Sequence, residues 1–193
     1  MYKPLEEISA TCTEEDQPIF RNVKHALHVA FLMEVIDFHA KSNLRRLIEI
    51  AAQKYGIDEP QVRSVNWGRM TDMEKKATGA MIRCTCQRLL PESLFFFVVA
   101  KYSHVSLQKV PAIAYCAENL FPFCKIQDSR AIAHMLCHAI NHGRPSGDEI
   151  AQKFRVRRET ISRDIRIVEE AGREFDQKVN DILRPVFRGD GAI

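Results

Sequence analysis

Residues 146–166 carry the feature that most constrains the fold, because two helical patterns meet there at a short turn. Ser146 or Asp148 can cap the first helix, since either side chain can accept hydrogen bonds from the free amides of a first turn. Apolar residues recur at helical spacing on both sides of the turn: Ile150, Ala151 and Phe154 before it, and Val156, Ile161 and Ile165 after it. The small Ala151 lets the two helices cross closely, so the stretch predicts a helix-turn-helix.

The outward face of the second helix is basic. Arginine can bond a guanine edge with two hydrogen bonds, and arginine or serine can hold a phosphate. Base contacts normally come from the N-terminal part of the second helix. We therefore predict a double-stranded DNA surface whose base contacts come from Arg157, Arg158, Glu159, Ser162 and Arg163. Lys153, Arg155 and Arg166 are placed for phosphates, and Thr160 completes the DNA-binding set.

The segment EIAQKFRVRRETISRDI resembles the helix-turn-helix of bacterial and phage transcription regulators, in which an "IA…V.R.TISRDI" pattern recurs. This chain departs from the pattern at Arg155, where such motifs usually have glycine for a left-handed turn. The resemblance implies a sequence-specific DNA-binding transcription regulator. The alternative is a protein-interaction module that docks a partner through the same helices without reading DNA.

Further segments are similar to phage late-gene antitermination proteins of the Q type. They are NWGRM at residues 66–70, RLLP at residues 88–91 and TISRDI at residues 160–165. This resemblance implies a phage or prophage regulator that binds DNA near a promoter and acts with RNA polymerase. It assigns no polymerase-contacting residue.

The rest of the chain predicts an all-α helical bundle. We expect a mobile arm over residues 1–18, a helical region over residues 19–90, and a DNA-binding region with a long C-terminal helix over residues 91–193. Thr71 and Glu74 form a capping box that should start a helix ending near Leu90. The apolar run SLFFFVVAKY should be a buried helix, with a buried strand as the alternative. Pro111 should lie in the first turn of a helix that begins near Val110.

The C-terminal segment repeats apolar positions at spacings of three and four, which is a heptad pattern. Its members are Ile165, Val168, Gly172, Phe175, Val179, Ile182 and Val186. Such a helix either packs on its own domain or forms a homodimer contact, and the pattern leaves both open. Gly172 should destabilise this helix, because glycine lowers helix stability by about 1 kcal/mol relative to alanine in a helix interior.

Composition narrows the other possibilities. A net charge of +3 indicates a local basic patch rather than a uniformly basic protein. The opening residues are polar and acidic, and the longest apolar run, residues 94–100, is too short to cross a membrane, so we expect a cytoplasmic protein with reduced cysteines. His134, His138 and His142 share one helical stripe that could hold zinc, whereas the favoured interpretation has no metal, no cofactor and no enzymatic activity.

Overall fold

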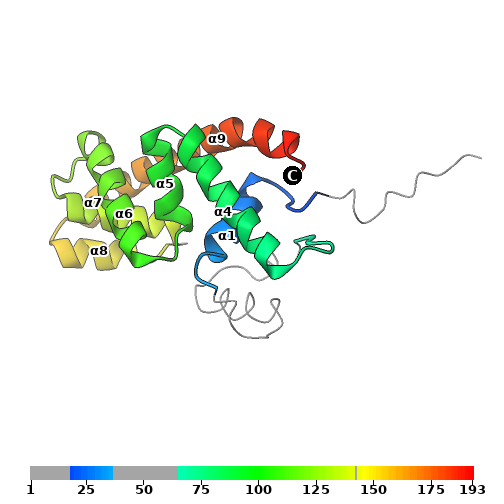
Figure 1. Cartoon of the computed structure of the whole chain (residues 1–193). Helices are drawn as coiled ribbons and strands as arrows, with labels where there is room; N and C mark the ends of the chain where they lie inside the picture. The colour runs from blue at the N-terminus through cyan, green and yellow to red at the C-terminus, as the bar shows by residue number, and fades with distance from the viewer. Residues whose placement is uncertain (1–17, 37–64, 142) are drawn as a thin grey trace, which may run out of the picture.

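The computed structural model describes residues 18–36, 65–141 and 143–193, and over these ranges the protein is all-helical without a β-strand, as predicted (Figure 1). The elements are α1 (Val23–Leu32), α4 (Asp72–Leu89), α5 (Glu92–Tyr102), α6 (Ser106–Leu120), the 3₁₀ turn η2 (Phe121–Phe123), α7 (Ser129–Ile140), α8 (Gly147–Phe154) and α9 (Arg158–Gly189). The predicted arm up to residue 17 and the helical pattern of residues 44–55 lie outside the described residues.

Local sequence signals set where several helices begin. At the start of α4, Glu74 N donates to Thr71 Oγ1 over 3.3 Å and Thr71 N donates to Glu74 Oε2 over 2.6 Å, which confirms the predicted capping box. Ser146 and Glu149 form an equivalent box at α8, so Ser146 rather than Asp148 is the cap. These hydrogen bonds favour the charged carboxylates and lower the pKa of Glu74 and of Glu149.

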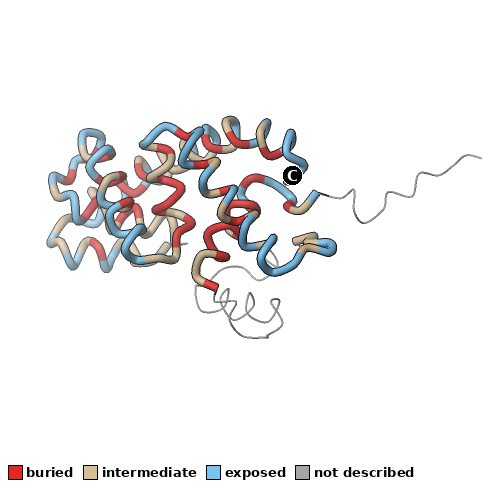
Figure 2. Tube along the Cα trace, viewed as in Figure 1, coloured by how far each residue is buried: buried red, intermediate tan, exposed pale blue. Residues whose placement is uncertain are grey.

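The long helix α9 organises the bundle. It contacts α7 and α8 as well as α5, α1 and α4, while α5, α6 and α7 pack in sequence against one another (Figure 1). Figure 2 shows the buried positions on the inward sides of these helices, where they form one hydrophobic cluster. The two ends of this bundle meet, since Phe20 N donates to the Ala192 carbonyl over 2.8 Å.

The apolar stripe of α9 packs on its own chain. Ile165, Val168 and Val179 are buried, and Leu183 and Phe187 extend the buried face toward the end of the helix. Of the two alternatives, packing on its own domain or a homodimer contact, the structure therefore shows the first. A homodimer through the remaining surface of this helix stays a prediction, as do the domain boundaries near residue 90.

One sequence-based expectation about helices was wrong. The helix α6 begins at Ser106 rather than near Val110 and contains Pro111 in its interior. A proline there removes one hydrogen bond at a cost of about 3 kcal/mol, but α6 buries Ala112 and Cys116, and that packing maintains the helix. The expected helix over residues 93–102 is confirmed, since these residues belong to α5, and the strand alternative is excluded.

Candidate functional site

The turn between α8 and α9 is built on Arg155. Its backbone is left-handed, with φ 53° and ψ 41°, and the amide of Val156 closes the turn by donating to the Ala151 carbonyl over 3.0 Å. Arginine thus takes the conformation that the related motifs assign to glycine. A residue with a Cβ pays roughly 1–2 kcal/mol for that conformation, so the turn is strained as anticipated.

The predicted DNA-binding residues follow one another along α8, the turn and the start of α9. The exposed members are Lys153, Arg155, Arg157, Arg158, Glu159, Ser162 and Arg166, and the half-buried members are Thr160 and Arg163. Several of these cations already have partners within the chain. Arg158 Nε lies 2.8 Å from Asp148 Oδ1, and Lys153 Nζ donates to His134 Nε2 over 2.9 Å. The ion pair with Asp148 therefore offsets one positive charge of this surface.

Asp164 is a structural residue that the sequence pattern did not single out. It is 0% exposed, accepts a hydrogen bond from Ile126 N over 3.0 Å, and accepts another from Arg163 Nη2 over 2.8 Å. It ties α9 to the segment before α7 and holds the Arg163 guanidinium at the same time. The signal was available, because Asp164 lies between Ile161 and Val168 at the spacing of the buried stripe.

The histidine stripe of α7 is divided between separate contacts. His134 Nε2 accepts the hydrogen bond from Lys153 Nζ, and its ring lies against the Phe154 ring with 5.3 Å between ring centroids. His138 Nδ1 donates to the Pro145 carbonyl over 2.7 Å, and His142 lies outside the described residues. Within residues 18–36, 65–141 and 143–193, no three histidine, cysteine, aspartate or glutamate side chains come together as a metal site.

An apolar groove of about 470 Å³ lies between α1, α4, α5 and α6. Phe95, Phe96 and Val99 line it from α5, so two phenylalanines predicted for the core are half-buried at its wall. Leu107 lines it from the start of α6 and is 89% exposed. Because these residues come from separate helices, the sequence pattern alone does not reveal the groove.

The groove also holds a carboxylate oxygen without a hydrogen-bond donor. Glu34 Oε1 accepts from Gln108 Nε2 over 2.9 Å, whereas Glu34 Oε2 is buried and has no partner among the described residues. The nearby Arg83 is engaged elsewhere, since its Nη1 donates to the Ala30 carbonyl. A buried acceptor left unpaired costs about 1–3 kcal/mol, so the groove favours an occupant that supplies a donor.

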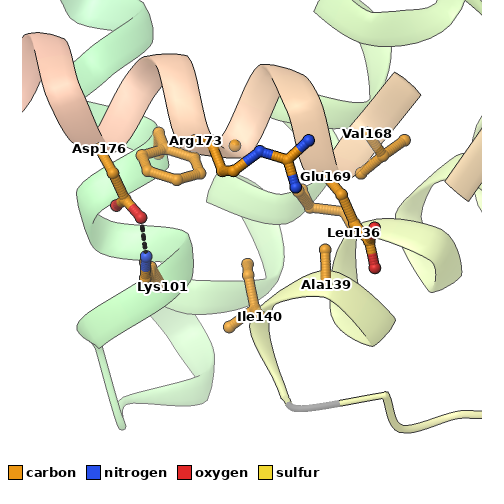
Figure 3. Close-up of a pocket in the computed structure, with 10 residues that line it drawn as sticks. Lys101, Leu136, Ala139, Ile140, Val168, Glu169, Arg173 and Asp176 are labelled. Atoms are coloured by element: carbon orange, nitrogen blue, oxygen red, sulfur yellow. Dashed lines mark hydrogen bonds and ion pairs between the residues drawn. The ribbon is translucent and has the colours of Figure 1, made fainter. Parts of the chain in front are cut away.

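A second hollow, of about 310 Å³, opens between α5, α7 and α9 (Figure 3). Lys101 from α5 and Asp176 from α9 form an ion pair at one side. Figure 3 shows Arg173 between that pair and Glu169, with Ala139 and Ile140 facing them from α7. Gly172, which lies in the interior of α9, lines the same hollow.

None of the described helices combines the length and the apolar character needed to cross a lipid bilayer. No protein-family model and no solved structure matches the chain. Over 134 residues the chain is 28% identical to the meiosis-specific cyclin rem1 of Schizosaccharomyces pombe. The matched region covers 64% of this chain and 30% of the cyclin, so the chain spans under two thirds of that relative's length.

This similarity to a eukaryotic cyclin corrects the predicted function. The expectation of a sequence-specific DNA-binding regulator of phage type, acting as an antiterminator with RNA polymerase, is wrong, and the similarity does not support docking through the helix-turn-helix either. The physical reason is that the apolar spacing of the motif reports the packing of α8 on α9, which a helix pair shows whether or not its outer face binds DNA. The roles of the basic side chains, the DNA and polymerase contacts and the bacterial resemblance are not tested by these findings and stay predictions.

Proposed function

We propose that this chain is a non-catalytic regulatory protein, cyclin-like in role, that acts by binding another protein in the groove between α1, α4, α5 and α6. The observation that carries the proposal is the apolar groove beside the 89% exposed Leu107. The similarity to a meiosis-specific cyclin supports a place in cell-cycle regulation.

The groove has the properties of a protein-binding surface. Burying an exposed leucine side chain contributes about 1.5–3 kcal/mol, which makes Leu107 a strong anchor for a partner. The half-buried Phe95 and Phe96 offer aromatic area beside it. Glu34 Oε2 adds selectivity, since a partner that places a donor there satisfies a buried acceptor that otherwise has none among the described residues.

The test compares two variants that introduce the same charge at the same helical position. Leu107 is the second residue of α6 and lines the groove, whereas Met73 is the second residue of α4, is 77% exposed and does not line it. Tagged full-length wild type, Leu107→Asp and Met73→Asp are expressed in dividing fission yeast, and co-purifying proteins are quantified by mass spectrometry.

We expect a cell-cycle protein to be recovered with wild type and with Met73→Asp. Its recovery should fall by roughly tenfold or more with Leu107→Asp, because a charge replaces the anchor. Both variants should unfold at the wild-type urea concentration, since both positions are exposed. Recovery that is equal for all three proteins, or that includes no cell-cycle protein, would contradict the proposal.

A further inference from the structure

The hollow between α5, α7 and α9 contains a glycine that the packing of the protein does not require. Gly172 lies inside the 32-residue helix α9, where glycine is disfavoured relative to any residue except proline. A Cβ built on it would meet no atom within 4 Å outside its own helix turn. By contrast, a Cβ on Gly79 would lie 3.2 Å from Met33 Cβ, so that glycine allows α4 to approach α1. Gly172 instead keeps open space in the hollow.

The wall of this hollow is apolar at one side. Phe97 from α5, Leu136 and Ile140 from α7, and Val168 from α9 line one side of a space of about 310 Å³, which is large enough for one ring-sized or branched side chain. Phe97 and Leu136 are themselves buried, so the apolar wall is held rigidly by the core. An apolar group of a ligand could therefore be buried here, away from water, without disturbing the fold.

The rim carries one charge of each sign that has no partner among the residues that the structure describes. Lys101 and Asp176 are paired with each other. Glu169 and Arg173 lie one turn apart on α9, yet over the described ranges neither side chain forms an ion pair or a hydrogen bond. Arg173 can bind a carboxylate with two hydrogen bonds, and Glu169 can accept hydrogen bonds from an ammonium group.

We propose that this hollow binds a free amino acid with an apolar side chain. The side chain enters the space beside Gly172, the carboxylate pairs with Arg173 and the ammonium group pairs with Glu169. A zwitterion fits better than a simple anion or cation, because the rim offers both unpaired charges within one helical turn. This site is separate from the groove of α1, α4, α5 and α6 and does not depend on the function proposed for that groove.

The test measures binding of L-phenylalanine, L-leucine and L-tryptophan to the full chain by isothermal titration calorimetry at pH 7. We expect saturable binding of at least one of them with a Kd on the order of 1 mM or tighter. For the amino acid that binds best, the analogue without the carboxylate and the analogue without the ammonium group should each bind about tenfold more weakly, since each leaves one charge unpaired. In the case of phenylalanine these analogues are phenethylamine and 3-phenylpropanoate.

Gly172→Leu should fill the space and abolish binding, while Gly189→Leu is the matched control. Both glycines lie in α9, and neither Cβ would meet another atom within 4 Å, but only Gly172 lines the hollow. Both variants should melt at or above the wild-type temperature, which separates loss of the site from loss of the fold. The proposal is overturned if none of the three amino acids binds saturably, if Gly172→Leu binds like wild type, or if both analogues bind as tightly as the amino acid.

Discussion

The basic turn between α8 and α9 differs from the apolar groove between α1, α4, α5 and α6 in how many of its side chains have partners within the chain. At the turn, Arg158 is paired with Asp148 and Arg163 with Asp164. In the groove, Leu107 is exposed and Glu34 Oε2 has no donor among the described residues. Two arginines of the turn are therefore already paired within the chain, whereas the groove leaves an apolar side chain and a buried acceptor unsatisfied.

The largest effect should come from removing Asp164, which tests whether the arginine beside it is structural. Asp164→Ala leaves the Ile126 amide without its acceptor and frees Arg163 from a buried carboxylate. We expect a loss of about 2–4 kcal/mol in the free energy of unfolding. Urea titration followed by circular dichroism measures it.

The matched control is Asp148→Ala, which removes the other arginine partner. The side chains of Arg158 and Asp148 are 72% and 64% exposed, so their ion pair should contribute less than about 1 kcal/mol. Equal losses in the free energy of unfolding would show that the buried Asp164 stabilises the fold no more than the exposed Asp148 does. The difference between the basic turn and the groove would then be smaller.

Acid should destabilise the protein through His28 and His104. Burial and the neighbouring Lys24 and Lys101 lower the pKa of His28 to about 4, and burial with Lys109 lowers the pKa of His104 to about 4. In the unfolded chain these imidazoles bind protons near pH 6.5. The stability they contribute is therefore complete above pH 6.5 and is lost as the pH falls from about 6.5 to about 4.

After allowance for partial exposure, we expect a loss on the order of 1–3 kcal/mol across that range, measured by urea titration at several pH values. His28→Gln removes one titrating group, although it also removes the edge contact with the Tyr102 ring at 4.7 Å. The His28→Gln variant should be less stable than wild type at pH 7, but its free energy of unfolding should fall less than that of wild type on acidification. An unchanged acid loss in His28→Gln would exclude His28 as a source.

The sequence predicted those features that depend on neighbouring residues. The capping box at Thr71 was predicted because its partner lies three residues away, and Ser146 was one of the two caps predicted for α8. The start of α6 was misjudged because burial of one helical face outweighed the local preference of Pro111. The left-handed turn at Arg155 was anticipated from the resemblance to helix-turn-helix motifs, which usually have glycine at that position.

The groove and the hollow could not be predicted in the same way. Glu34 and Gln108 are separated by 74 positions, and Lys101 and Asp176 by 75, so each pair depends on the packing of whole helices. The function was misassigned for a related reason. A run of arginines is visible in one segment, whereas the intramolecular partners of Arg158 and Arg163 and the exposed Leu107 become evident only in three dimensions.

The smallest effect should come from Arg155, and it separates the strain of the turn from the charge of the surface. Arg155→Gly removes the charge and also relieves the left-handed backbone, whereas Arg155→Ala removes the charge and keeps the strain. We expect the glycine variant to be more stable than the alanine variant by roughly 1 kcal/mol in urea titration, less what glycine gains in unfolded-state entropy. If the alanine variant were clearly the more stable of the two, the strain of the turn would be smaller than the entropy that glycine gains in the unfolded chain. If both variants were more stable than wild type, repulsion among the arginines would be the shared cause, and the basic turn would then hold charge that its own chain has not neutralised.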